Sequence, residues 1–197
     1  MRAQLNARSL DGYERMFWTV VNELKSPENA GMIVRSHVAF GGEEIVVIGK
    51  EPWRFKKRAQ SFSRRLEQLC NFRYLKDEAS FFDWCRDASV VPVAIEIAQP
   101  PTVLPDFAFP DRVAIIMGNE GRGLSPAFRS QCFATVTIPQ FGPVGSLNAA
   151  VSATIVMYEL TRREPVERQI LDAKYIVDPA ERPRIPNRLT GRLSGPA

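Results

Sequence analysis

The segment 133–160 constrains the fold more than any other part of this chain, because three unlike patterns follow one another in it. An apolar strand pattern over residues 133–138 ends at Pro139, and a loop rich in glycine and proline follows. The polar group 146–148 then precedes residues 149–160, which are small and apolar. A strand, a loop too rich in glycine to fill its own space and a helix form the connection at which an open α/β sheet binds ligands.

The helix predicted over residues 149–160 has two kinds of surface. Val151, Ile155 and Tyr158 recur at the spacing of one helical face. The remaining sides carry alanine and serine, whose small side chains allow another backbone to approach closely. This pattern predicts a helix that is packed on more than one side.

The rest of the chain alternates between strand and helix patterns. The first strand pattern, over residues 15–24, is a near-continuous apolar run, which is typical of a parallel-sheet strand buried on both faces. Further strand patterns cover residues 44–49, 72–75, 90–97, 112–117 and 133–138. Helix patterns cover residues 27–40, 61–69, 78–87, a short segment after Ser125 and 149–160. Residues 100–105 have the composition of a linker. We therefore predict an α/β fold with a parallel sheet flanked by helices.

Length and composition predict one domain over residues 1–164, followed by a short helix and an Arg/Pro-rich tail over 165–197. The chain has no run of about 18 apolar residues and no apolar signal core at its start, so we expect a cytoplasmic protein without a membrane span. Three widely spaced cysteines fit neither a disulfide framework nor a metal site. A net charge of +4 permits nucleic acid as a partner.

The first motif is Asn29-x-Gly31-x-x-x-Arg35, which follows the helix start Ser26-Pro27. By itself it fits a capped amphipathic helix with an exposed arginine. Asn29 and Arg35 lie about 240° apart around a helix, so we expect them to have separate tasks. The only histidine, His37, has no neighbours in sequence that would support a catalytic triad, and we interpret it as structural.

The second motif is Gly118-Asn-Glu-Gly-Arg-Gly123, directly after the strand predicted over 112–117. It is neither a Walker loop nor a dinucleotide fingerprint, and a tight strand–helix turn with a solvated Glu120 remains an alternative. The third motif consists of Ile138-Pro and Ser146-Leu-Asn148. Locally, Ser146 could instead cap the following helix, with Asn148 in its first turn.

Taken together and in order, the three motifs resemble the SpoU (TrmH-like) family of SPOUT RNA 2′-O-ribose methyltransferases. The resemblance covers roughly residues 15–160. Two small departures stand in the third motif, where Gln140 follows Ile-Pro at a position more commonly apolar, and Gly145 precedes Ser146.

The resemblance implies a parallel sheet between helices, a C-terminal deep trefoil knot, and a homodimer whose sites form at the subunit interface. It implies S-adenosylmethionine as cofactor and no metal, and it assigns these roles: cofactor binding to Gly118, Ile138 and Leu147, and catalysis to Arg35, Asn29, Glu120, Ser146 and Asn148. The implied reaction is attack of a ribose 2′-hydroxyl on the sulfonium methyl. Because a guanidinium is a poor base, we interpret Arg35 as a phosphate clamp and Glu120 or a substrate phosphate as proton acceptor.

The substrate implied by the resemblance is tRNA or rRNA. We expect RNA contacts from the dimer surface, from the basic segment 53–73 and from the arginine-rich tail, with tRNA favoured over rRNA. Two alternatives stay open: a non-catalytic knotted RNA-binding or assembly protein, and a phosphate-loop nucleotidase. The intact polar set of the motifs disfavours the first, and a glycine loop without lysine disfavours the second.

Overall fold

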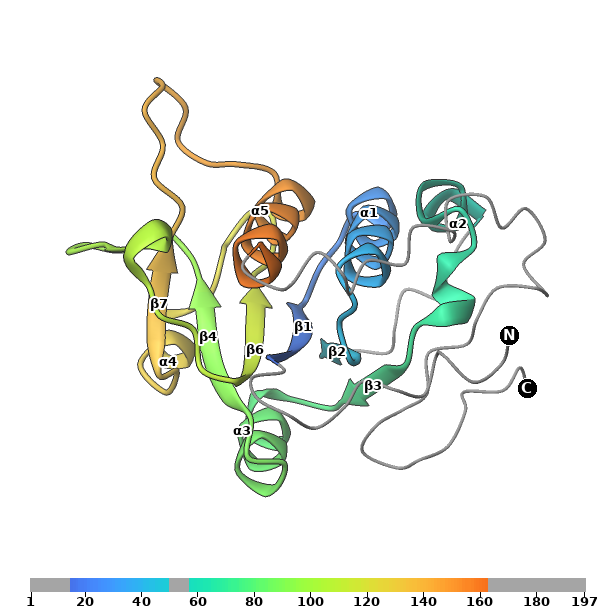
Figure 1. Cartoon of the computed structure of the whole chain (residues 1–197), viewed down its shortest axis with the longest axis horizontal. Helices are drawn as coiled ribbons and strands as arrows, with labels where there is room; N and C mark the ends of the chain where they lie inside the picture. Colours follow the sequence, from blue (N-terminus) through green and yellow to red (C-terminus); the bar gives the residue numbers. More distant parts are fainter. Residues whose placement is uncertain (1–14, 50–56, 163–197) are drawn as a thin grey trace.

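The computed structural model describes residues 15–49 and 57–162 of the chain. Within them, seven strands form one sheet of order β3-β2-β1-β6-β4-β7-β5, in which every neighbouring pair is parallel (Figure 1). The strands are β1 (Met16–Asn22), β2 (Ile45–Ile48), β3 (Phe72–Leu75), β4 (Val91–Ile95), β5 (Thr102–Val103), β6 (Arg112–Met117) and β7 (Ala134–Thr137). The predicted α/β class with a parallel sheet is confirmed.

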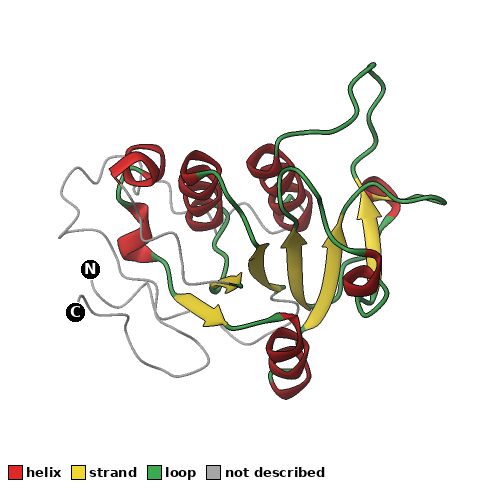
Figure 2. Cartoon of the chain, turned by 180° about the vertical axis from the view of Figure 1, so that it is seen from behind, coloured by secondary structure: helices red, strands yellow, loops and turns green. Residues whose placement is uncertain are grey.

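Helices cover both faces of this sheet (Figures 1 and 2). The helices are α1 (Pro27–Ala39), α2 (Lys57–Ser63), α3 (Glu78–Asp87), α4 (Pro126–Arg129) and α5 (Ala149–Thr161), with short 3-10 turns at Leu66–Leu69 and Leu104–Asp106. Successive side chains of a strand point to opposite faces. In β6, Val113, Ile115 and Met117 pack in the cluster of α1 and α5, whereas Ala114 and Ile116 pack in the cluster of α3 and α4.

The helix starts follow the capping residues of the sequence. The Ser26 hydroxyl accepts a hydrogen bond from the backbone N–H of Asn29 at 3.2 Å, and Pro27 occupies the first turn, where its missing N–H costs nothing. Ser125 caps α4 in the same way, through the N–H of Phe128. The predicted starts of these two helices, α1 and α4, are therefore confirmed.

Two predicted segments differ from the structure. The predicted linker 100–105 contains β5, which pairs with β7 but is too short to produce a period in the sequence. The single helix predicted over 61–69 is instead α2 followed by a 3-10 turn, because Arg64 and Arg65 adopt left-handed backbone at φ 55° and 60° and end the α-helix.

Two of the three residues of the apolar face predicted on α5 point away from the sheet, whereas Ile155 is partly buried against the core. Val151 is 45% exposed and Tyr158 is 58% exposed. The face that packs on the sheet consists of Ala150, Ala153, Val156, Met157 and Leu160. α5 is therefore apolar on both sides, and periodicity could not show which side the sheet would cover.

The predicted domain boundary at residue 164 and the helix and tail over 165–197 lie outside the described residues. The trefoil knot stays a prediction. Across the residues that the structure describes, no helix is long and apolar enough to cross a membrane.

His37 lies between α1 and the sheet, where its side chain is buried. Its Nδ1 is 2.8 Å from the hydroxyl of Thr19, and its ring meets the edge of Phe17 at a centroid distance of 5.7 Å. It lines neither of the two cavities described below. This placement agrees with a structural role.

We expect His37 to make stability depend on pH. Burial lowers the pKa of His37 from 6.5 to about 3, against a weaker opposing hydrogen bond with Gly42. The unfolded chain therefore binds a proton near pH 6.5 that the folded chain does not bind until about pH 3, so stability falls as pH drops through this window. Between pH 7 and pH 5 the loss in unfolding free energy should be about 2 kcal/mol.

Urea unfolding at pH 7, 6 and 5 measures this loss. The variant His37→Gln should show a flatter pH dependence over the same range, because glutamine does not titrate. Equal slopes for the two proteins would assign the pH dependence to other groups.

Candidate active site

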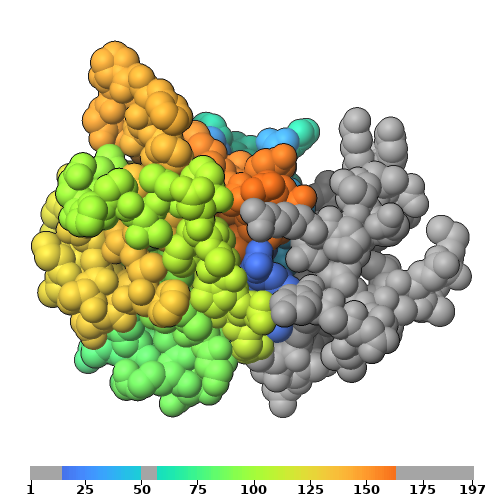
Figure 3. Space-filling view, turned by 60° about the vertical axis from the view of Figure 1, so that its left-hand side comes forward, coloured from blue at the N-terminus to red at the C-terminus, as the bar shows by residue number. Residues whose placement is uncertain are grey.

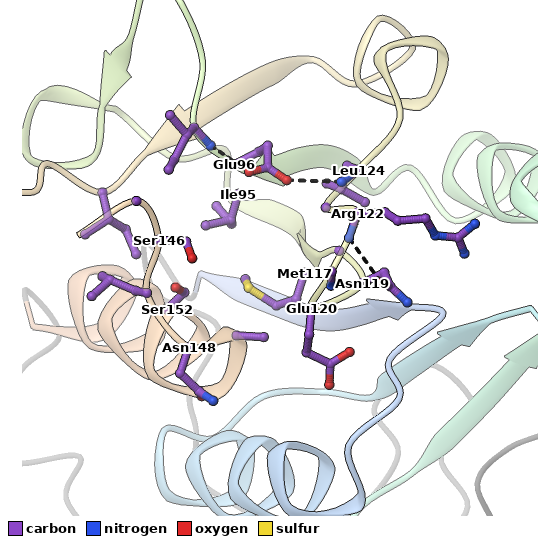
Figure 4. Close-up of a pocket in the computed structure, with 18 of the residues that line it drawn as sticks. Ile95, Glu96, Met117, Asn119, Glu120, Arg122, Leu124, Ser146, Asn148 and Ser152 are labelled. Atoms are coloured by element: carbon purple, nitrogen blue, oxygen red, sulfur yellow. Dashed lines mark hydrogen bonds between the residues drawn. The ribbon is translucent and has the colours of Figure 1, made fainter.

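A cavity of about 650 Å³ opens at the carboxyl ends of β4, β6 and β7 (Figure 4). Its volume lies in the range of roughly 300–1,000 Å³ that is typical of small-molecule sites. Six of the eight predicted site residues line it: Gly118, Glu120, Ile138, Ser146, Leu147 and Asn148. The loop over residues 139–147 stands away from the body of the protein at one side of this cavity (Figures 1 and 3).

Hydrogen bonds join the three sequence motifs. Glu120 accepts from the backbone N–H groups of Lys25 and Ser26, each at 2.9 Å, and from the Asn29 side-chain amide at 3.0 Å. The Asn29 amide oxygen in turn accepts from the amide of Asn148 at 2.9 Å. Figure 4 shows the Glu120 side chain pointing toward α1. Asn29 is thus a link between two residues that line the cavity.

Asn148 also starts α5. Its side-chain oxygen accepts from the N–H of Ala150 at 2.9 Å and of Val151 at 3.3 Å, which makes Asn148 the N-cap of the helix. The alternative in which Ser146 caps this helix is therefore wrong. Ser146 is exposed and lines the cavity, where its hydroxyl can meet a ligand.

The hydrogen bonds to Glu120 determine its charge state. Burial alone would raise the pKa of this carboxyl, but the N–H groups of Lys25 and Ser26, its own backbone N–H and the Asn29 amide outweigh burial, and the pKa is lowered. A carboxylate with a lowered pKa is a weak proton acceptor at neutral pH. The geometry therefore favours Glu120 as a positioning group over Glu120 as a general base.

The loop after β6 is shaped by Asn119 and Gly118. The Asn119 side chain accepts from the N–H groups of Gly121 and Arg122 and donates to the carbonyl of Glu23 at 2.8 Å. A Cβ atom on Gly118 would lie 2.5 Å from the backbone carbon of Gly123, so only glycine allows the loop to close on itself here.

Glu96 is a cavity residue that the sequence analysis missed. Its carboxylate accepts from the N–H of Leu124 at 3.0 Å and from its neighbour Ile97 at 2.9 Å, and it fills the space beside Gly123 (Figure 4). Glu96 directly follows β4, and this position at a strand end is the signal that could have identified it.

Arg35 lies apart from this cavity. It is exposed on α1 and lines a second cavity of about 580 Å³ between α1, α2 and α5, together with Arg64, Phe62 and Val151. The expected divergence of Asn29 and Arg35 around α1 is confirmed, because Asn29 faces Glu120 and Asn148 while Arg35 faces outward.

Residues 16–158, which are most of this chain, match the model of the SpoU rRNA methylase family. The chain belongs to the SpoU rRNA methylase family. A relative from Mycobacterium ulcerans, named an uncharacterized tRNA/rRNA methyltransferase, is 31% identical over 150 residues, which are 73% of this chain and 46% of that protein. This SpoU chain therefore spans about half the length of the relatives that it matches.

Solved structures agree with this assignment. The SpoU methyltransferase AviRb from Streptomyces viridochromogenes is similar with a TM-score of 0.68 and 30% identity, over 76% of this chain and 60% of AviRb. The AdoMet-bound rRNA methyltransferase from Sinorhizobium meliloti is similar with a TM-score of 0.72 and 25% identity, over 77% of this chain and 58% of that protein. The three motifs of this SpoU chain thus occur in a parallel sheet between helices, as the resemblance implied, and this fold is shared with solved SpoU methyltransferases.

Proposed function

We propose that this chain transfers a methyl group from S-adenosylmethionine to a ribose 2′-hydroxyl of RNA. The observation that carries the proposal is the cavity at the strand ends, beside which Asn29 joins the three motifs through its hydrogen bonds to Glu120 and Asn148. Two similar structures support the chemistry: AviRb has been solved with AdoMet, and a protein named RNA 2′-O ribose methyltransferase is 26% identical over 79% of this chain with a TM-score of 0.68.

The cavity fits such a cofactor. Ile138 and Leu147 give it apolar walls, and Ser146 and Asn148 add polar groups. This mixed lining and a volume of about 650 Å³ suit a ligand of nucleoside size. When bound, S-adenosylmethionine supplies an electrophilic methyl group on a sulfonium. We assign its binding to Gly118, Ile138 and Leu147.

In this proposal the polar residues fall into groups with different tasks. Arg35 binds a phosphate of the RNA and stabilises the charge that develops on the attacking oxygen, because a guanidinium is a strong donor and a poor base. Glu120, Asn29 and Asn148 hold the loops in place. Ser146 orients the reacting groups. Since Glu120 is a weak acceptor, we assign the hydroxyl proton to a substrate phosphate.

We further propose a homodimer through the outer faces of α2 and α5. Phe62, Val151 and Tyr158 are 40%, 45% and 58% exposed there, and Phe62 and Val151 line the second cavity together with Arg35. Contiguous exposed apolar side chains mark an interaction surface. A second copy on this surface would bury them and bring its own Arg35 toward the first chain, which explains why Arg35 lies outside the cavity of its own chain.

Isothermal titration of the full chain with S-adenosylmethionine tests the cofactor. Absence of binding would favour the non-catalytic RNA-binding alternative, and binding of ATP alone would favour the nucleotidase. For the substrate, we propose tRNA before rRNA. Mass spectrometry of digested tRNA and rRNA from a deletion strain identifies the RNA fraction that loses a 2′-O-methyl nucleoside.

The basic segment gives a prediction for RNA binding. Lys57 and Arg58 are exposed at the start of α2, where Arg58 pairs with Glu28, and Arg54 and Lys56 lie outside the described residues. If all four contact RNA phosphates, neutralising them should lower the log–log salt slope of RNA binding by about 0.7–0.9 for each contact. Filter binding at several salt concentrations measures the slope, and an unchanged slope would show an ordinary solvated surface.

A further inference from the structure

Two exposed arginines share the second cavity. Arg35 comes from α1, and Arg64 directly follows α2. Among the described residues neither side chain makes a hydrogen bond or an ion pair. Other arginines of the described chain do pair with carboxylates: Arg58, Arg73, Arg86, Arg122 and Arg162. None of the described residues that line this cavity is acidic, so it carries two uncompensated positive charges.

Gly31 of the first motif brings the two arginines together. A Cβ atom at Gly31 would lie 2.3 Å from the carbonyl oxygen of Ala59 and 3.0 Å from the backbone nitrogen of Ser63, so only glycine lets α2 pack this closely on α1 (Figure 1). Ser63 is the last residue of α2, and Arg64 follows it. Arg35 lies one turn beyond Gly31 on the same face of α1, about 6 Å along the helix axis. Both long side chains therefore start beside the same helix contact.

The turn after α2 holds Arg64 in an unfavourable backbone conformation. Arg64 and Arg65 have left-handed backbone, at φ 55° and 60°, which glycine adopts much more readily than arginine. Of these two side chains, only that of Arg64 lines the second cavity. Backbone strain of this kind is concentrated at functional sites. Here it places a second cation in the cavity that Arg35 already lines.

Two unpaired guanidinium groups in one cavity suit a phosphate. Each presents a planar fork of N–H donors that matches phosphate oxygens, and each stays charged at neutral pH. The adjoining helix α2 is also basic at its start, where Lys57 and Arg58 are exposed, and it contains no acidic residue. A surface with charge of one sign fits an RNA backbone better than it fits a second copy of the same surface.

We propose that Arg35 and Arg64 bind one and the same phosphodiester of the RNA backbone. This inference rests on the proposed function, because it deepens the task assigned there to Arg35. It adds Arg64 as a substrate-binding residue that none of the three motifs contains, and it gives Gly31 the task of setting the spacing between the two arginines. In the proposed dimer this phosphate lies at the seam between the subunits.

RNA binding by the full chain tests the shared phosphate. Filter binding of unfractionated tRNA and of total rRNA identifies the RNA that is bound more tightly, and the variants are measured on that RNA. Arg64→Ala should weaken binding about tenfold, because a charge-assisted hydrogen bond is lost. The double variant Arg35→Ala/Arg64→Ala should lower the log–log salt slope by about 0.7–0.9 in total, the value of one phosphate. A loss of about 1.4–1.8 would indicate two separate phosphates and would overturn the shared site.

Two other arginines serve as comparisons. Arg65→Ala removes the adjacent charge from the same turn but outside the cavity, so it should weaken RNA binding clearly less than Arg64→Ala. Equal losses would indicate a general basic surface and would overturn the site. Arg86→Ala, on α3, should bind RNA like the wild type.

Two further substitutions at the same position separate charge from fold. Arg64→Lys keeps the charge without the planar fork and should recover only part of the affinity that Arg64→Ala loses. Circular dichroism checks that each variant is folded. Arg64→Gly replaces Arg64→Ala if the latter does not fold, because glycine accepts this backbone conformation.

The outcomes separate the two proposals. If folded Arg64→Ala binds RNA as tightly as the wild type, or if sedimentation shows that it has lost the dimer, the phosphate site is overturned. Methyl transfer by the wild type then still supports the proposed function. If the wild type binds neither RNA nor S-adenosylmethionine, both proposals are overturned.

Discussion

Replacing Arg35 by alanine should lower the rate of methyl transfer by a factor on the order of 10³, while the affinity for S-adenosylmethionine stays within a few-fold. The rate falls because the guanidinium no longer stabilises the developing oxyanion or holds the RNA phosphate. The affinity persists because Arg35 does not line the larger cavity. Binding and catalysis are therefore expected to separate in one variant.

Single-turnover methyl transfer and isothermal titration measure the two quantities. Arg35→Lys keeps the charge without the planar fork and should recover only part of the rate. Arg86→Ala is the matched control, because Arg86 is an exposed arginine on α3, across the sheet from α1 and α5. A large loss of cofactor affinity in a folded, dimeric Arg35→Ala protein would contradict the assignment.

Mixed dimers of two inactive variants should recover up to about half of the wild-type rate for each mixed dimer. One variant is Arg35→Ala, which keeps its cavity. The other blocks the cavity and keeps Arg35. If Arg35 of one chain serves the cavity of the other, a mixed dimer contains one site with both parts intact. If each site is built within one chain, both sites carry a defect and no activity returns.

The structure guides the choice of the blocking variant. A side chain at Gly118 would collide with the backbone of Gly123 and deform the loop. Gly145 also lines the cavity, but a Cβ there meets nothing within 4 Å, so Gly145→Trp should fill the cavity without disturbing the fold. Both variants must first be shown to dimerise by sedimentation. Inactive mixed dimers would then exclude the shared site.

Much of the architecture followed from the sequence alone. The apolar runs, the caps at Ser26 and Ser125, and the glycine loop after β6 are local signals, and each depends on residues within a few positions of one another. These local sequence patterns were therefore sufficient to predict the parallel α/β class and to identify the motifs that place the site at the strand ends.

The tertiary structure alone decided what these motifs do to one another. Asn29 and Glu120 are 91 positions apart, and Asn29 and Asn148 are 119 apart, so no local pattern could show that their side chains meet. The cap of α5 illustrates the same limit, because Ser146 and Asn148 are both good caps and only the folded loop selects Asn148.

The exposed side of α5 could not be predicted from the sequence either, but for a different reason. Its two sides are both apolar, and a hydrophobic period is the same whether the sheet or a second protein covers it. Packing on the sheet selected the side with Ala153 and Met157 and left Val151 and Tyr158 exposed, with Val151 in the same cavity as Arg35. Sequence thus determined which residues can carry the chemistry, and tertiary packing decided that Arg35 stands outside the cavity that Glu120 and Asn148 share.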